Sequence, residues 1–98
     1  MTEADETKLL ERASQGERSA YDALVRALAP AVWSLLRRLT ADAETAEDAM
    51  QETFIAGWRS ASSFRGDGSA RSWMYGLARR HAARTWRRRV GEPSRMES

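Results

Sequence analysis

The sequence contains no cysteine, which excludes disulfide bonds, thiolate metal sites and a thiol nucleophile. It has no apolar run near the ~20 residues that a membrane-spanning helix needs, and no signal-peptide pattern precedes its charged start. Proline occurs only twice in 98 residues, so helices are rarely interrupted. We therefore expect a soluble, cytoplasmic protein of one domain, with a modest core and no room for a large active-site cavity.

Residues suited to catalysis or metal binding are also scarce. His81 is the only histidine, and it shares a helix face with apolar residues. No carboxylate lies three or four residues from it, which favours a packed histidine over a ligand or a base. The chain lacks the Glu-x-x-His pairs of helical-bundle metal sites. Gly66 and Gly68 have neither the preceding strand nor the third glycine of a dinucleotide loop. We expect no enzymatic activity, no metal and no cofactor.

Charge is divided unevenly along the chain. The net charge is +2, but residues 1–58 carry 6 basic and 11 acidic side chains, a net −5. Residues 59–98 carry 10 basic and 3 acidic side chains, a net +7. This division indicates two surfaces with different partners, one of them a polyanion. The alternative is a basic helix that faces only solvent.

Apolar spacing predicts an all-α fold, a compact bundle of about four helices. After a frayed start over residues 1–6, a first helix is expected over about 6–15, stopping at Gly16. Ser19 is a candidate N-cap for the next stretch. Its apolar residues keep one phase across Pro30, which predicts either one kinked helix or two nearly collinear ones.

The second half of the chain begins with a turn at 40–42 and a third helix over about 43–61. An extended loop over 62–69 follows, and Ser69 or Ser72 caps the last, basic helix. That helix is expected to end near Arg89. Residues 90–98 contain Gly, Pro and Ser without an apolar period, which predicts a linker or a frayed end after a domain of residues 1–89.

The third helix is expected to have an acidic outer side with an isoleucine near its middle. Its buried side is expected to hold Ala46, Ala49, Met50, Thr53, Phe54, Gly57 and Trp58. The opposite side holds Asp48, Gln51, Glu52, Ile55 and Arg59. A partner-binding face has a use for Ile55 that a solvated face lacks. Single exposed aliphatic residues are common, however, so both interpretations stay open at this point.

The segment 63–89 combines aromatic rings with positive charge. Phe64, Trp73 and Tyr75 lie near the start of the last helix, where arginines alternate with small residues on one side. Gly76 costs the helix about 1 kcal/mol relative to alanine, which is reasonable if another molecule approaches there. Arginines beside flat rings are suited to nucleic-acid phosphates and exposed bases. Trp86 either belongs to an interface or covers the end of the bundle.

Three segments in fixed order carry a resemblance to a known family. They read A-S-Q-G-E-R-S-A-Y-D-A-L at 13–24, A-E-T-A-E-D-A-M-Q-E-T-F-I-A-G-W-R at 43–59 and S-F-R-G-D-G-S-A-R-S-W-M-Y-G-L-A-R at 63–79. Together they resemble region two of a bacterial sigma factor of the extracytoplasmic-function (ECF) group, over about residues 9–89. The resemblance implies a domain that binds core RNA polymerase and recognises and melts the promoter minus-ten element, without nucleotide hydrolysis.

The resemblance also implies which residues act. In this family the third helix docks on the clamp helices of the polymerase β′ subunit, a role that falls on Asp48, Gln51, Glu52, Ile55 and Arg59. The loop would form a pocket for a flipped base from Phe64, Arg65, Gly66, Asp67 and Ser69. The non-template strand and its phosphates would be held by Arg71, Trp73, Arg80, Arg84, Arg87 and Arg88. An anti-sigma protein is a further expected partner.

Two departures from the family pattern leave parts of this interpretation open. Arg80 stands where the family often has asparagine, and arginine favours guanine or phosphate over adenine, so the minus-ten preference is undetermined. No second helix-turn-helix domain for the minus-thirty-five element follows, which is expected of a fragment or of a short factor that needs a helper. The alternatives are a stand-alone regulator that binds duplex DNA and a module whose basic helix binds an acidic protein. The aromatic loop favours strand capture.

Overall fold

Four α-helices and one short 3₁₀ helix make up the fold. The computed structural model describes the backbone of residues 1–97 and the side chains of residues 1–88. In chain order the elements are α1 (Glu3–Ser14), α2 (Arg18–Leu39), α3 (Ala43–Ser60), the 3₁₀ helix η1 (Ala61–Ser63) and α4 (Ala70–Glu97). The described backbone contains no strand. The prediction of an all-α bundle of about four helices is therefore confirmed.

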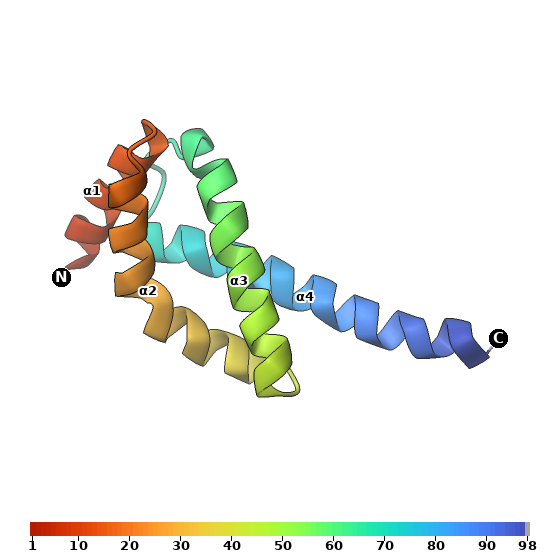
Figure 1. Ribbon diagram of the computed structural model, residues 1–98. Coiled ribbons are helices and arrows are strands. Elements are labelled where there is room, and N and C mark those ends of the chain that lie inside the picture. Colours follow the sequence, from red (N-terminus) through yellow and green to blue (C-terminus); the bar gives the residue numbers. More distant parts are fainter. Residues whose placement is uncertain (98) are drawn as a thin grey trace.

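The helices are arranged around the first half of α4. Figure 1 shows α1, α2 and α3 beside this half, whereas the second half extends away from the bundle toward the C-terminus. α4 contacts each of the other three helices, and α2 also packs against α1 and α3. The extension accounts for the elongated dimensions of 49 × 23 × 21 Å. Fully buried side chains between the helices include Leu10, Leu24, Leu28, Leu36 and Met74.

α1 starts earlier than predicted because Thr2 and Asp5 form a capping box. The Thr2 hydroxyl accepts a hydrogen bond from the Asp5 amide, and the Asp5 carboxylate accepts one from the Thr2 amide, both at 3.1 Å. These bonds lower the pKa of Asp5. The expectation that residues 1–6 are frayed was thus wrong from Glu3 onward. The predicted stop is confirmed, since Gly16 has a φ of +96° that glycine adopts without strain.

α2 is a single helix that continues through Pro30, one of the two predicted arrangements. Proline removes one backbone donor and crowds the preceding turn, and the helix bends along its length (Figure 1). The predicted cap at Ser19 was wrong, because α2 already begins at Arg18 with Glu17 as its N-cap residue. The Glu17 side chain makes no capping bond. Instead its carboxylate pairs with Arg12 of α1, which ties the two helices together at their connection.

α3 follows the prediction closely. The Asp42 carboxylate accepts a hydrogen bond from the Thr45 amide at 2.7 Å and so caps the helix. Gly57 is buried against Tyr21 of α2, and a methyl group at position 57 would clash with the Tyr21 hydroxyl. That hydroxyl donates to the carbonyl of Phe54. The predicted inner side is confirmed as buried at Ala46, Ala49, Thr53 and Gly57 and as partly buried at Met50, Phe54 and Trp58.

α4 begins at a well-defined cap and is longer than predicted. The Ser69 hydroxyl accepts a hydrogen bond from the Ser72 amide at 3.1 Å, so Ser69, not Ser72, is the cap. The backbone is helical to Glu97, so the expected end of this helix near Arg89 was wrong, whereas the linker or frayed end expected over residues 90–98 stays a prediction. Each residue added to an existing helix forms one more backbone hydrogen bond, so a helix can continue through residues of weak helix propensity. Ser98 lies outside the described residues, and the domain boundary after Arg89 stays a prediction.

No helix within the described residues is both long enough and apolar enough to cross a membrane.

Candidate protein and nucleic-acid interfaces

The outer side of α3 is exposed, as predicted, around Ile55. The Ile55 side chain is 55% exposed, which is unusual for a large aliphatic residue in this structure. Asp48, Gln51 and Arg59 are exposed around it, whereas Glu52 is only partly exposed. We call the exposed set Asp48, Gln51, Ile55 and Arg59 the α3 face. Its combination of one apolar group with surrounding polar and charged groups is typical of a protein-binding surface.

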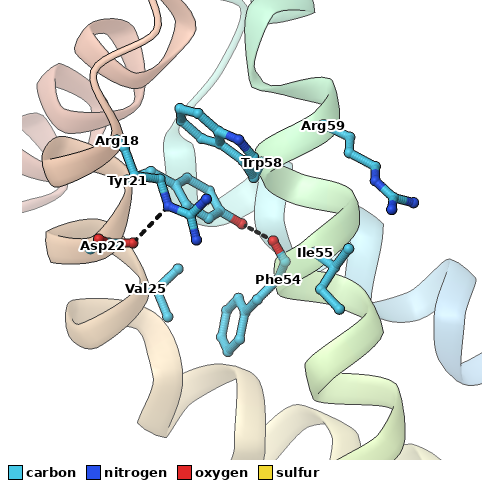
Figure 2. A pocket seen from close by; sticks show the side chains of 8 residues that line it. All are labelled: Arg18, Tyr21, Asp22, Val25, Phe54, Ile55, Trp58 and Arg59. Atoms are coloured by element: carbon cyan, nitrogen blue, oxygen red, sulfur yellow. Dashed lines mark hydrogen bonds and ion pairs between the residues drawn. The ribbon is translucent and has the colours of Figure 1, made fainter.

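Beside the α3 face lies a groove between α2 and α3, with a volume of about 360 Å³. Figure 2 shows its lining, in which Phe54 and Val25 face each other while Arg59 points away from the Tyr21 and Trp58 rings. The groove is lined by Arg18, Tyr21, Asp22, Val25, Phe54, Ile55, Trp58 and Arg59. We call it the α2–α3 groove. It gives the α3 face an apolar recess that continues onto α2.

The walls of the α2–α3 groove are held in place by local contacts. The Tyr21 and Trp58 rings lie 5.5 Å apart, and the Arg18 guanidinium lies 5.0 Å from the Trp58 ring centre. Arg18 also donates to Asp22 at 3.1 Å. Burial raises the pKa of Tyr21 to about 12, so its hydroxyl stays protonated and donates to the Phe54 carbonyl. The α2 side of this surface was not predicted, because apolar spacing does not show which residues of α2 lie beside α3.

The loop before α4 is built on two glycines and one aromatic pair. Gly66 and Gly68 have φ values of +86° and +82°, a region in which other residues are strained. Phe64 packs edge-on against Trp73, with ring centres 6.3 Å apart and planes at 70°. The predicted loop residues Arg65, Gly66 and Asp67 are exposed, whereas the Ser69 hydroxyl is engaged as the helix cap.

A hollow of about 430 Å³ lies between this loop and the end of α1. It is lined by Glu11, Ser14, Gln15, Phe64, Arg65 and Gly66. The structure thus brings three predicted loop residues together at one recess, and we call this recess the loop pocket. The contribution of α1 was missed, because nothing in the sequence pattern relates positions 11–15 to a loop some 50 residues later.

Arg71 does not belong to an open basic surface. Its guanidinium donates to both carboxylate oxygens of Glu6 in α1, at 2.9 and 3.4 Å. Glu6 is only 3% exposed, and this contact raises the pKa of Arg71. A second contact joins the same two helices, since the Ala70 amide donates to the Thr7 hydroxyl at 3.2 Å. The Arg71 side chain therefore fastens the start of α4 to α1.

The outer side of α4 is basic and largely uncovered. Arg80, Arg84 and Arg87 are exposed, and none of them forms an ion pair among the residues whose side chains are described. A methyl group added at Gly76 would meet no atom within 4 Å. No contact within the described part of the chain therefore requires glycine there. We call Gly76, Arg80, Ala83, Arg84 and Arg87 the α4 basic face.

Arg88 differs from the other predicted arginines because it reaches α3. Its guanidinium lies 3.2 Å from one carboxylate oxygen of Glu52, and His81 Nδ1 lies 3.5 Å from the other. His81 is 8% exposed, which confirms that it is packed. The sequence has no carboxylate three or four residues from His81, and the carboxylate that does approach it, Glu52, comes from α3. The resemblance assigned Glu52 to polymerase binding and Arg88 to DNA binding, but in the structure the two residues form an ion pair with each other.

Trp86 is mostly exposed at the end of the bundle. It is 63% exposed and lies beside Leu39, which is aliphatic and 43% exposed. The two residues line a hollow of about 130 Å³ together with Thr40, Ala41, Thr45 and Ala82. Leu39 ends α2, so no further turn of that helix covers it.

Among the side chains that the structure describes, no group of three or more histidine, aspartate or glutamate residues is placed to hold a metal ion.

Comparison with known proteins gives consistent similarities. A family model described as Sigma-70 region 2 matches residues 24–91. The RNA polymerase sigma-H factor of Pseudomonas aeruginosa is 35% identical over 80% of this chain and 40% of its own length. The ECF RNA polymerase sigma-E factor of Haemophilus influenzae is 37% identical over 71% of this chain and 36% of its own length. The chain therefore spans about two fifths of these curated relatives.

One solved structure is similar over nearly the whole chain. It is an NMR structure of the complex formed by an engineered region 2 of sigmaE with GTAAAA. The TM-score is 0.79 and the identity 28%, over 95% of this chain and 94% of the other. The four-helix arrangement described above is thus that of a domain studied in complex with this hexanucleotide.

Proposed function

The chain belongs to the Sigma-70 region 2 family, and from this premise we propose that it is the part of an ECF sigma factor that binds core RNA polymerase and recognises and melts the promoter minus-ten element. The observation that carries the proposal is the presence of two uncovered surfaces of different chemistry on one bundle. The α3 face surrounds an exposed isoleucine with polar and charged groups, and the α4 basic face is rich in arginine. The complex of the similar sigmaE domain with GTAAAA supports the DNA-binding part.

The α3 face and the α2–α3 groove form the polymerase-binding site in this proposal. The clamp helices of the β′ subunit are a coiled coil, and a helix surface offers apolar side chains at regular spacing. Ile55 is exposed for contact with such a side chain, and the groove between Val25 and Phe54 has room for another. An anti-sigma protein would block polymerase binding most directly by covering this same surface. Location in the cytoplasm follows from the partner.

The loop pocket and the α4 basic face form the DNA-binding site. A base can be read along its whole edge once it has left the stack, and a pocket that accepts it also retains the melted strand. The loop pocket has an aromatic wall at Phe64 and polar groups from Glu11 and Gln15. Arg80, Arg84 and Arg87 are exposed for phosphate contacts along the same helix. Binding energy within the polymerase complex would drive strand opening.

One observation favours a second candidate function. α4 extends beyond the bundle, and the small residues Gly76 and Ala83 lie among the arginines of its basic side. Small residues would let the helix backbone come close to duplex DNA, as in a helix that enters the major groove. A stand-alone regulator would bind duplex sites without polymerase.

Binding of the chain to core RNA polymerase and to duplex DNA, measured separately at moderate salt, tests the two functions. Tight polymerase binding with weak duplex binding supports the sigma-factor proposal. Duplex binding without polymerase binding would contradict it and favour the stand-alone regulator. Binding to neither would leave an acidic protein as the partner of the basic helix and would also contradict the proposal.

A further inference from the structure

Two exposed apolar side chains lie together at the end of the bundle. Trp86 of α4 is 63% exposed and Leu39 of α2 is 43% exposed, and both line one hollow of about 130 Å³. The described residues contain only two other exposed large apolar side chains, those of Met1 and Ile55, and neither lines this hollow. We call it the end hollow; its lining consists of Leu39, Thr40, Ala41, Thr45, Ala82 and Trp86. Apolar groups that gather at the surface in this way indicate a binding site.

The wall of the end hollow is mainly apolar. Ala41 and Ala82 contribute methyl groups beside the two larger side chains. The Thr40 hydroxyl donates to the Leu36 carbonyl at 2.6 Å, so its donor is engaged within the chain. An apolar cavity of about 150 Å³ accepts a molecule of the size of benzene. The end hollow therefore fits one aromatic or large aliphatic side chain of another molecule.

Arginines lie next to the lining residues of the end hollow on two helices. Arg37 and Arg38 are in the last turn of α2, directly before Leu39, and Arg87 follows Trp86 on α4. All three arginines are exposed, and none forms an ion pair among the side chains that the structure describes. Their guanidinium groups are therefore available to the carboxylates of a partner.

Two carboxylates precede Thr45 at the start of α3. The Asp42 carboxylate caps α3 by accepting from the Thr45 amide at 2.7 Å, whereas Glu44 is exposed. The three arginines outnumber these carboxylates, so the rim of the end hollow is net positive. Such a rim attracts an acidic partner and repels a second copy of the chain, because symmetric pairing would bring the same arginines together.

The end hollow lies apart from the two interfaces of the proposed function. Thr45 is ten residues before Ile55, which places it about 15 Å away along the axis of α3. Trp86 and Arg84 are two residues apart on α4, so their side chains point about 160° apart around the helix axis. Arg87 lies between these two directions and borders both surfaces. The hollow itself thus belongs neither to the α3 face nor to the α4 basic face.

We propose that the end hollow binds an acidic protein segment, which places one large apolar side chain in the hollow and its carboxylates on the neighbouring arginines. A short segment with a single anchor fits best, since a hollow of about 130 Å³ holds one side chain. A buried apolar anchor supplies most of the affinity in such a complex, and the surrounding charges orient the segment. This proposal does not depend on the proposed function, because it uses neither polymerase nor DNA.

Fluorescence anisotropy with two glutamate-rich peptides tests the apolar part of the proposal. One peptide carries a single central phenylalanine, and the other carries alanine in its place. We expect the phenylalanine peptide to bind about tenfold more tightly at moderate salt, because only its ring is buried in the end hollow. Trp86→Ala should abolish this preference while the fold is retained, since the side chain is mostly exposed. Leu39→Ala is a second variant with the same expected result, should Trp86→Ala fail to fold.

The charged part of the proposal is tested on α2. Arg38→Gln should weaken binding of both peptides by about two- to fivefold and keep the preference for phenylalanine, as expected for an exposed ion pair at the rim. Arg26→Gln is the matched control, because Arg26 is exposed on the same helix, lies thirteen residues before Leu39 and forms no ion pair in the described side chains. Equal losses from the two substitutions would contradict the role of the rim.

Three further outcomes would overturn the proposal. The first is equal affinity of the two peptides for the unmodified chain, or a preference that survives both Trp86→Ala and Leu39→Ala. The second is a dimer of the chain that Trp86→Ala dissociates, which would assign the hollow to a second copy. The third is weaker binding of a single-stranded oligonucleotide containing GTAAAA, the sequence in the sigmaE complex, by Trp86→Ala, which would assign the hollow to nucleic acid. None of these outcomes bears on polymerase binding at the α3 face.

Discussion

Ile55 is the residue whose exposure the packing of α3 does not explain. Its neighbours on the inner side contact α2 and α4, whereas Ile55 points outward and is 55% exposed. We predict that Ile55→Glu abolishes binding to core RNA polymerase, since the substitution places an uncompensated charge at the centre of the α3 face. The fold should be retained, because the side chain contributes little to the core. Polymerase affinity and a thermal unfolding curve measure the two effects.

Leu39→Glu is the matched control, because Leu39 is also exposed and aliphatic but lies at the end of α2. Normal polymerase binding by a folded Ile55→Glu protein, or equal losses in the two variants, would contradict the assignment of the α3 face.

Gly57 and Gly76 look alike in the sequence, since each lies inside a helix, but the structure gives them opposite roles. A methyl group at Gly57 would clash with the Tyr21 hydroxyl, which is fixed by its bond to the Phe54 carbonyl. We predict that Gly57→Ala lowers the free energy of unfolding by about 1–3 kcal/mol. Gly76 has open space, so Gly76→Ala should raise it by up to about 1 kcal/mol.

Urea unfolding of both glycine variants measures this difference, and DNA binding adds a second readout for Gly76→Ala. A stabilised variant with weakened strand binding would show that the glycine serves the interface. Two variants with the same change in stability would contradict the packing argument.

At the scale of the helices, α1 has a role that its short length does not suggest. It fastens the start of α4 through Arg71, whose guanidinium pairs with the buried Glu6. We predict that Arg71→Ala lowers the free energy of unfolding by about 1–3 kcal/mol, because it leaves a buried carboxylate without its partner. Arg87→Ala, at an exposed position without an ion pair in the described side chains, should change it by less than about 0.5 kcal/mol. Equal effects on chemical denaturation would contradict a structural role for Arg71.

Helix existence and orientation could be predicted from the sequence because they depend on local spacing. The inner side of α3 and the stop at Gly16 were identified in this way. The pairing of Glu6 with Arg71, 65 residues apart, could not be, since periodicity gives the face of a residue and not its neighbour across the bundle. The same holds for Glu52 and Arg88. The family resemblance assigned both arginines to DNA, and charge and position along one helix gave no sign of their partners across the bundle.

At the scale of the whole molecule, the acidic first part and the basic last part meet at α3 and α4. The net charges of −5 for residues 1–58 and +7 for residues 59–98 are kept on different helices, which contact each other along the bundle. Opposite charges in one small domain attract different partners and discourage the polyanion from binding at the wrong face.

This separation predicts how the molecule responds to loss of charge at different places. Arg80→Ala combined with Arg84→Ala should weaken binding of the single-stranded minus-ten sequence within the holoenzyme and leave polymerase binding unchanged. Each lost phosphate contact reduces the slope of log affinity against log salt by about 0.7, so the slope should fall by about 1.4. Arg37→Ala combined with Arg38→Ala removes the same charge from exposed positions at the end of α2 and should leave the slope unchanged. Equal effects of the two pairs would mean that total charge, and not the α4 basic face, determines strand binding.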